Sequence, residues 1–442
     1  MPYFFLSLRQ VFAGTGVLFF SLFLLLLGGG LQGSLVSIRG TDEGFSTLVL
    51  SIISTGYYVG YFSGAIIVPM WLKRVGYIRV FAALVAMASV AAIIYPMFID
   101  KNLWFAMRVL TGFCFAGIFM VCESWLNSQT YNENRGKVLS MYLIIIFVGM
   151  TTGQFLLNIG DINGYFLFAL GSIVISVASV PLLLTTRPAP VIDESTVTLT
   201  IRQLYRRSPL GVVSSFFANF MNGTIIGLAA IYAKSIGLPI EQIAWFVASA
   251  YIGVIIFQLP IGYLSDRIDR RYMMIFLCLS AAAISLWATN LHDSQWLILS
   301  VGLLGGVALP MYAICIAHVN DRLKPEEVLP ATTALLKIAG VGNMVAPLFT
   351  GWLMVQWGVE WFFGAVGVAA AIVALFAMYR TTQADLDIDE QSDYAPIGAM
   401  TATSATLSLA HEGIQLEFDF GEAHRKPADA EYMTIDSEDE ML

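Results

Sequence analysis

Twelve long apolar runs, joined mostly by short connections, constrain this chain more than any other feature. Lipid offers no partner to an unpaired peptide group, so a segment that crosses it must be a helix of about 20 mostly apolar residues. The runs lie near residues 12–36, 46–69, 78–98, 103–125, 137–159, 164–185, 209–234, 241–263, 272–291, 295–318, 331–355 and 361–379. We therefore expect an all-α membrane protein with twelve transmembrane helices.

The composition excludes a water-soluble protein. Of the 442 residues, 57% are hydrophobic and 12% are charged, whereas soluble domains carry roughly 45–50% apolar and about 25% charged residues. The first run has no charged segment before it and no small-residue cleavage site after it. We interpret it as a retained helix rather than a signal peptide.

One longer connection divides the chain. It separates six runs from six, and it predicts bundles at residues 1–186 and 209–380 joined by a cytoplasmic linker at 187–208. Residues 381–442 carry 15 of the 31 acidic residues but only two of the 23 basic ones. High charge and low apolar content predict a disordered acidic tail. We interpret this tail as a solvated appendage, with autoregulation as the alternative.

Basic residues predict the orientation. Placing both termini in the cytoplasm puts 18 Lys and Arg residues on that side, against three outside (Arg39, Lys101 and Lys234). Such an excess is typical of cytoplasmic loops. We expect a multi-pass protein with both termini in the cytoplasm, working as a monomer and without nucleic acid; the family resemblance given below implies the bacterial inner membrane.

The two halves share an internal repeat. Identical residues recur 193 positions apart at equivalent points of four spans: Tyr58/Tyr251, Gly60/Gly253, Arg74/Arg267, Asn127/Asn320 and Gly149/Gly342. Two same-orientation halves with a cavity between them are the architecture of one class of secondary transporter. The repeat predicts two pseudo-symmetric six-helix bundles.

The loop after the eighth run carries the most specific motif. It reads Gly-Tyr-Leu-Ser-Asp-Arg-Ile-Asp-Arg-Arg from Gly262 to Arg271, which resembles the signature loop of the major facilitator superfamily. With Arg108-x-x-x-Gly112 in the fourth run and Gly149-x-x-x-Gly153-Gln154 in the fifth, the chain most resembles the YcaD-like bacterial branch.

The resemblance implies a cytoplasmic latch that holds the two halves together. In the family an aspartate caps a neighbouring helix, and Asp266 stands at its position, although Asp269 replaces the usual glycine. In the first-half copy Lys73 stands in place of the acid. The residues implied for the latch are Arg74, Gly76, Asp266, Arg267 and Arg271.

Ionisable residues inside lipid are costly, so each one is a candidate for function. Arg108 is expected to contact an anionic solute or to tune a proton-carrying group, with carbonyl bonding as the structural alternative. Glu123, 15 residues further along, is the one carboxylate clearly within a run. It is either a proton-coupling group or part of a packing or gating ion pair.

Lys337 and His318 complete this group. Lys337 has the apolar Ile144 as its counterpart in the repeat, and it is either an anion contact, a partner of Glu123, or a side chain that reaches the membrane interface. His318 ends the tenth run and is either a titrating group or an interfacial hydrogen-bonding residue.

The resemblance implies a cavity lined by the first, fourth, seventh and tenth spans. The polar and aromatic candidates there and in flanking spans are Gln32, Tyr57, Tyr61, Gln154, Asn219, Asn222, Tyr251, Gln258, Tyr312 and Asn343. This mixed lining favours an amphipathic or singly anionic solute over a sugar. Each of these residues has a packing role as its alternative.

Enzymatic and ATP-driven classes have no support in the sequence. No phosphate-binding Gly-x-x-x-x-Gly-Lys-Ser/Thr loop is present, and Gly28-x-Gly30-x-x-Gly33 lies late in an apolar helical run rather than after a strand. No metal or cofactor is expected. We expect a proton-coupled exporter, with anion uptake and a non-transporting sensor as alternatives.

Overall fold

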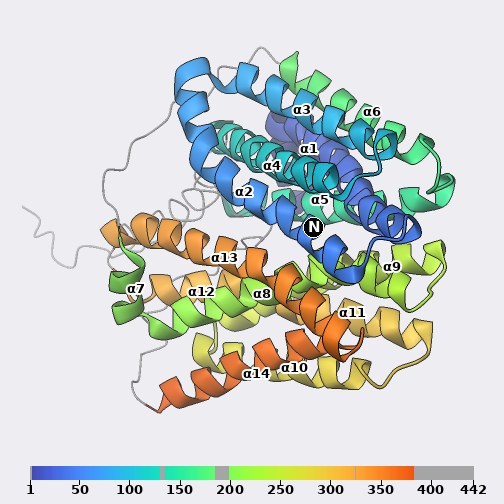
Figure 1. Ribbon diagram of the computed structural model, residues 1–442. Helices are drawn as coiled ribbons and strands as arrows, with labels where there is room; N and C mark the ends of the chain where they lie inside the picture. The colour runs from blue at the N-terminus through green and yellow to red at the C-terminus, as the bar shows by residue number, and fades with distance from the viewer. Residues whose placement is uncertain (1, 130–134, 185–198, 324, 383–442) are drawn as a thin grey trace, which may run out of the picture.

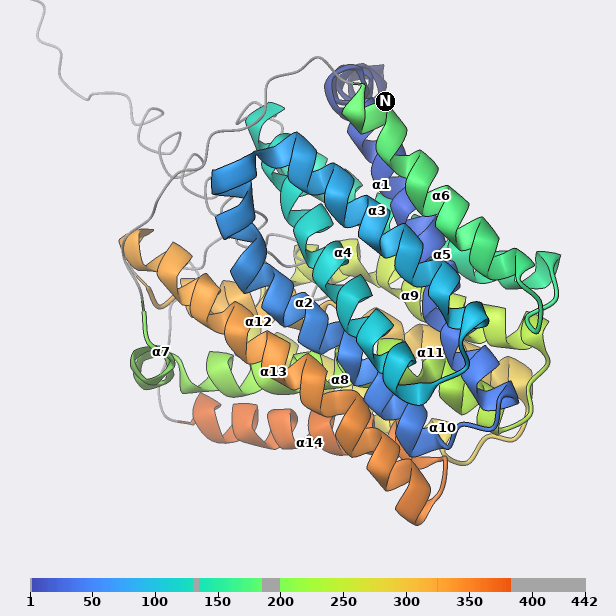
Figure 2. The ribbon, with the colours of Figure 1, turned by 45° about the horizontal axis from the view of Figure 1, so that its top comes forward.

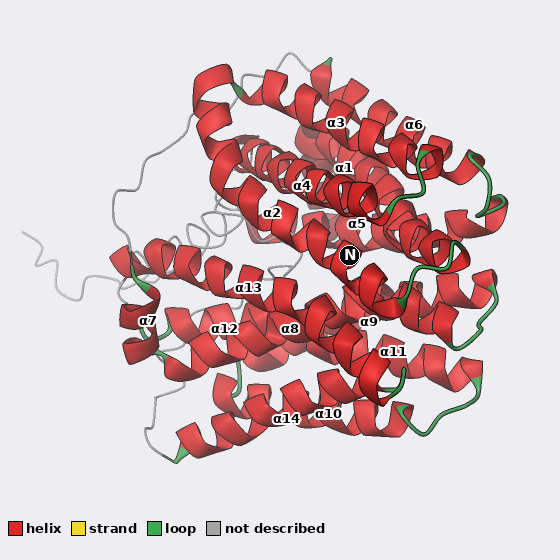
Figure 3. Cartoon of the chain, viewed as in Figure 1, coloured by secondary structure: helices red, strands yellow, loops and turns green. Residues whose placement is uncertain are grey.

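Twelve helical stretches in the described part of the chain are long and apolar enough to cross a membrane, as the apolar runs predict. The structure is a computed structural model, and it describes residues 2–129, 135–184, 199–323 and 325–382. The regular elements of these residues are all helical (Figure 3). Residues 383–442 and most of the linker lie outside the described residues. The disordered acidic tail and the cytoplasmic linker therefore remain predictions.

The helices form two groups that lie one above the other in Figure 1. The first group comprises α1 (Pro2–Asp42), α2 (Thr47–Val75), α3 (Tyr77–Met97), α4 (Lys101–Gln129), α5 (Arg135–Phe155), the short 3-10 helix η2 (Leu156–Ile159) and α6 (Phe166–Leu183). The second comprises α7 (Ile201–Arg207), α8 (Pro209–Ser235), α9 (Ile240–Ser265), α10 (Arg270–Ala288), α11 (Ser294–Ala308), α12 (Met311–Asn320), α13 (Pro325–Trp357) and α14 (Trp361–Thr381).

Short polar caps and glycine turns end and restart the helices. The Ser46 hydroxyl accepts a hydrogen bond from the Val49 N–H at the start of α2, and the Asp100 carboxylate accepts two backbone N–H bonds at the start of α4. Both satisfy donors that a helix leaves open at its first turn. Positive φ angles, which suit glycine, occur at Gly44, Gly76, Gly237 and Gly358.

The same helix pairings recur in both halves. In the first half α1 packs on α5 and α6, α2 packs on α4, and α3 packs on α4 and α6. In the second half α8 packs on α13 and α14, α9 packs on α11, and α10 packs on α11 and α14. Corresponding helices thus have corresponding partners.

Two glycines of the 193-residue repeat show the correspondence at atomic level. A methyl group added at Gly60 of α2 would lie 1.9 Å from the carbonyl oxygen of Val109 on α4. At Gly253 of α9 it would lie 1.9 Å from the carbonyl oxygen of Gly302 on α11. The partners are also 193 residues apart. Glycine is therefore required at both positions because two helix backbones touch there.

Two predicted elements differ from the structure. The run at 295–318 is not one helix but two, α11 and α12, because the chain turns at Leu309 and Pro310. Pro310 has no N–H to donate and starts the second helix. The linker also contains a helix that the sequence analysis did not predict. This helix, α7, begins with a capping box at Thr200 and Gln203 and is tied to α13 by an ion pair between Arg207 and Glu327.

An ion pair and an aromatic contact join the two halves at one end of the helices. We call the side that holds α7 the linker side, and the other the opposite side. Lys234 of α8 pairs with Asp42 of α1 at 2.8 Å on the opposite side, and the rings of Phe155 and Trp245 lie 4.7 Å apart there. Helices α2 and α13 approach each other on that side and diverge toward α7 (Figures 1 and 2).

Candidate functional site

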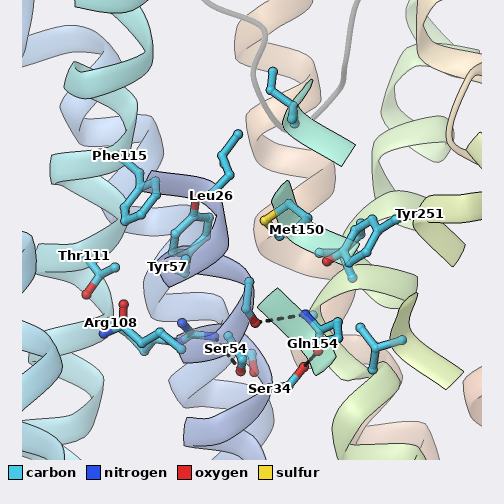
Figure 4. A pocket seen from close by; sticks show the side chains of 18 of the residues that line it. Leu26, Ser34, Ser54, Tyr57, Arg108, Thr111, Phe115, Met150, Gln154 and Tyr251 are labelled. Atoms are coloured by element: carbon cyan, nitrogen blue, oxygen red, sulfur yellow. Dashed lines mark hydrogen bonds between the residues drawn. The ribbon is translucent and has the colours of Figure 1, made fainter. Parts of the chain in front are cut away.

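A central cavity lies between the two halves, at the level where α1, α2, α4 and α5 face α8 and α9. Its empty volume is about 780 Å³, including space that is open to the outside. Figure 4 shows Arg108 on one side of the cavity and Tyr251 on the other. The lining residues are Leu26, Gly29, Gly30, Gln32, Gly33, Ser34, Ser54, Tyr57, Tyr58, Arg108, Thr111, Phe115, Phe119, Ile146, Met150, Gln154, Ile226, Gly227, Val247 and Tyr251.

Arg108 is the only charged residue among the described residues that line this cavity. Its Nη2 donates a long hydrogen bond to the Gly33 carbonyl oxygen at 3.4 Å, and its guanidinium carbon lies 5.7 Å from the centre of the Tyr57 ring. Its buried Nε has no partner among the described residues. One carbonyl and one aromatic face do not neutralise the charge, so the guanidinium retains binding capacity toward the cavity.

Two buried glutamines of the cavity differ in their bonding. Gln154 is satisfied, because it accepts from the Ser34 hydroxyl at 2.6 Å and donates to the Gly30 carbonyl at 2.8 Å. These bonds hold α5 against α1. Gln32 is only 2% exposed, yet neither its amide nitrogen nor its amide oxygen has a partner in the described part of the chain. A buried amide without partners is costly, and the Gln32 amide therefore has hydrogen-bonding capacity left for a ligand in the cavity.

The two halves contribute unequally to the wall. All the hydroxyl, amide and guanidinium groups except the Tyr251 hydroxyl come from the first half. The second half contributes Ile226 and Gly227 from α8, and Val247 and Tyr251 from α9. The cavity therefore has a polar wall and a mainly apolar wall that face each other.

Glu123 lies outside this cavity, on the linker side of it. It is on α4, 15 residues after Arg108 and therefore about 22 Å along the helix. Its side chain is fully buried, and the Tyr142 hydroxyl of α5 donates to Glu123 Oε1 at 2.5 Å. A charge-assisted bond of this kind holds a carboxylate in a protein interior. Arg108 and Glu123 are thus two separate sites on one helix.

Neither of the other two ionisable candidates lies in the cavity. Lys337 is exposed on the face of α13 that also carries the exposed Val341, Val345 and Leu348. It forms no ion pair with Glu123, and its place on an apolar outer face agrees with a side chain that extends to the interface. His318 is buried, and its Nδ1 lies 2.9 Å from Arg322 Nη1.

Of the ten candidates for the cavity wall, four line it: Gln32, Tyr57, Gln154 and Tyr251. Three others bond to each other between α8 and α13 instead. Asn222 donates to the Asn343 side chain at 3.2 Å, and Asn343 donates to the Asn219 side chain at 3.0 Å. The cavity wall also lacks Tyr61, Gln258 and Tyr312, so the tenth span adds no residue to it.

Sequence reasoning missed four polar lining residues, namely Ser34, Ser54, Tyr58 and Thr111. Thr111 had a readable signal, because it follows Arg108 by three residues and so lies on the same helix face. Tyr58 also had one, because it is the counterpart in the 193-residue repeat of Tyr251, which was already a candidate.

The signature loop forms ion pairs within the second half. Buried Arg270 lies 2.6 Å from Asp321 and 3.7 Å from Asp266. Asp269 accepts the Arg271 N–H at 2.8 Å, which caps α10, and pairs with the Arg271 side chain at 2.6 Å. The cap explains why aspartate can replace the family's glycine here.

The remaining residues of the implied latch are on the surface of the linker side. Arg267 is exposed and lies 4.0 Å over the Tyr263 ring, and Arg74 is exposed at the end of α2. Gly76 has φ +92° and joins α2 to α3, a conformation that L side chains rarely adopt. The ion pairs of Arg270 and Arg271 given above lie within the second half.

Sequence comparison gives a consistent family match. The model of the Major Facilitator Superfamily matches residues 18–221 and 210–411. A curated relative, the uncharacterized MFS-type transporter YcaD of Escherichia coli O139:H28 (strain E24377A / ETEC), is 25% identical over 340 residues, which cover 75% of this chain and 87% of the relative. The protein of the same name from Escherichia fergusonii is 24% identical over 337 residues, with the same coverage.

Solved structures share the fold. The crystal structure of the nucleoside transporter NupG aligns with a TM-score of 0.68 at 14% identity, covering 83% of this chain and 98% of NupG. A bacterial homolog of the human lysosomal transporter Spinster, in an inward-facing and occupied conformation, aligns with a TM-score of 0.62 at 15% identity, covering 94% and 99%. At such identities the likeness concerns the fold alone.

Proposed function

The chain belongs to the major facilitator superfamily, and from this premise we propose that it exports a small amphipathic or anionic solute across the bacterial inner membrane, driven by a proton gradient. The central cavity carries the proposal. It lies between the halves, it holds the partly buried charge of Arg108, and its opposite wall is mainly apolar. Such a cavity suits a solute with one polar end and an apolar body.

The places where the halves touch support a mechanism of alternating access. The Asp42–Lys234 pair and the Phe155–Trp245 contact lie on the opposite side, and they must separate before the cavity opens there. Most of the described Lys and Arg residues near helix ends lie on the linker side. Because basic residues are enriched in cytoplasmic loops, this supports placing the linker side and both termini in the cytoplasm. On this assignment the structure supports a state closed toward the periplasm.

Glu123 is the proposed proton-carrying group. It is a buried carboxylate within the fourth span, where a charge is expensive, and protonation removes that charge. The replacement Glu123→Gln keeps an oxygen that can accept the Tyr142 bond but cannot titrate. We expect it to abolish solute accumulation driven by a pH gradient while solute exchange at equal pH continues.

Proteoliposomes with imposed pH or sodium gradients test this proposal. The exposed carboxylate of Glu241 on α9 provides the matched control, because Glu241→Gln removes an acid from the second half without touching Glu123. Full proton-driven flux in Glu123→Gln would remove Glu123 as the coupling group. Flux driven by sodium at constant pH would contradict proton coupling altogether.

A second candidate is uptake of a small organic anion, coupled to protons or sodium. The uncompensated charge of Arg108 favours it, since an anion is the natural counter-charge. The direction in which an imposed inward proton gradient moves the solute separates the two: accumulation with the proton means uptake, and depletion against it means export. A non-transporting sensor on the same scaffold predicts solute binding with no gradient-dependent flux.

A further inference from the structure

The central cavity contains a positive charge without a negative counterpart. Arg108 is the sole charged group of its described wall. The buried carboxylate on the same helix, Glu123, is about 22 Å away along the helix axis and accepts a bond from Tyr142. On the opposite side, Asp42 pairs with Lys234 and Glu43 pairs with Arg39.

Arg108 is partly buried and its Nε has no partner among the described residues, so an anion that reaches it would be stabilised by its charge. No described Asp or Glu lines the cavity, so the counter-charge has to arrive with the ligand. One guanidinium balances one negative charge. A cation would meet repulsion from Arg108, and a dianion would bring a second charge for which the described wall holds no partner.

The unpartnered groups around Arg108 fit an oxyanion. Arg108 bonds to the Gly33 carbonyl, and Gln32, the preceding residue on α1, has a free amide in the same cavity wall. A guanidinium presents two parallel N–H donors that match the two oxygens of a carboxylate. The Gln32 amide adds a further N–H donor.

The remainder of the cavity is suited to an apolar body. Phe115 and Phe119 of α4 lie with their ring centres 6.1 Å apart, and Tyr251 and Val247 of α9 form the opposing wall. Tyr251 is itself held by the Phe147 ring, at 6.3 Å between ring centres. Aromatic walls of this kind favour planar apolar groups.

We propose that the central cavity binds aromatic monoanions, with the carboxylate on Arg108 and Gln32 of the first half and the ring against Tyr251 and Val247 of the second half. This inference rests on the proposed function and adds the charge, the shape and the orientation of the solute. The carboxylate stays bound to the first half during the transport cycle, while the ring gains or loses its contacts as the second half moves.

Three probes of one shape test the charge rule on the purified full-length protein: 2-naphthoate, 2-naphthamide and 2-naphthylmethylammonium. Isothermal titration measures their binding. We expect 2-naphthoate to bind at least about tenfold more tightly than the amide, since bonds to a charged group are stronger than neutral ones. The ammonium probe is expected to bind more weakly still.

Variants test the assigned residues. Arg108→Gln should remove the preference of naphthoate over naphthamide, and Arg108→Lys should keep part of it, because the charge stays while the paired donors are lost. Gln32→Glu should abolish naphthoate binding by placing a negative charge beside the carboxylate. Lys101→Gln removes an exposed base at the start of the same helix and should change nothing. Thermal unfolding of each variant identifies any that misfold, and Arg108→Lys is the fallback if Arg108→Gln does.

The outcomes separate the inference from the proposed function. Equal binding of the three probes, tighter binding of the ammonium probe, or no binding of any of them overturns the inference. Arg108-dependent binding of naphthoate without gradient-driven flux in proteoliposomes supports the inference and contradicts the transport proposal. Flux of the ammonium probe in preference to naphthoate supports the transport proposal and contradicts the inference.

Discussion

The ion pair between Asp42 and Lys234 is the described charge contact that joins the two halves on the opposite side, at 2.8 Å. Its side chains are 29% and 23% exposed, so water screens their attraction, and exposed pairs contribute about 0.2–1 kcal/mol. We take the upper end, about 1 kcal/mol, because the geometry is close and partly covered. That energy corresponds to about fivefold in a conformational equilibrium.

Asp42→Asn should therefore raise the ratio of molecules open on the opposite side to molecules closed there by about fivefold. The double swap Asp42→Lys with Lys234→Asp should return the ratio to the wild-type value, because the pair forms again with its partners exchanged. Spin labels at Lys101 and His292, which are exposed in the first and second halves on that side, report the separation as a distance distribution. Glu241→Gln is the control on the same side.

If the double swap changes the open-to-closed ratio by the sum of the free-energy effects of Asp42→Lys and Lys234→Asp alone, the two residues act independently. That result would refute the reasoning. The same holds if Asp42→Asn leaves the distance distribution unchanged. Repeating the measurement in high salt provides a second check, since screening should reduce the wild-type preference for the closed state and leave Asp42→Asn unaffected.

The remaining predictions concern packing and capping. Gly60→Ala should destabilise the protein by about 1–3 kcal/mol through overpacking, since its methyl group would lie 1.9 Å from a backbone oxygen of α4; Gly171→Ala, whose nearest contact would be 3.7 Å away, should not. Asp269→Ala should lower the free energy of unfolding by about 1 kcal/mol more than Asp269→Asn, because asparagine still caps α10. Chemical denaturation in detergent measures both differences, and equal effects within either pair would contradict them.

The twelve spans could be predicted because their signal is local. A helix in lipid needs a long apolar run, and such a run is visible in one stretch of sequence. The repeat was visible too, since Gly60 and Gly253 recur at a fixed offset, and the structure shows that both allow helix backbones to touch. The break at Pro310 was not readable, because Pro69, Pro96 and Pro260 lie inside continuous helices.

The cavity was less predictable because it depends on how each helix is rotated. Gln32 and Gln154 are alike in the sequence, yet one is free and the other is fully bonded. Asn219 and Asn343 appeared to be candidates for solute contact, but their amides bond to each other. Polar residues in a span need either a ligand or a helix neighbour, and only the three-dimensional arrangement distinguishes the two.

The touching backbones at Gly60 and Gly253 also limit where an inhibitor of this protein can bind. No side chain lies between α2 and α4 at that point, nor between α9 and α11, so a small molecule cannot enter either helix pair there. We therefore expect a small-molecule inhibitor to bind between the two halves rather than between the paired helices at these glycines.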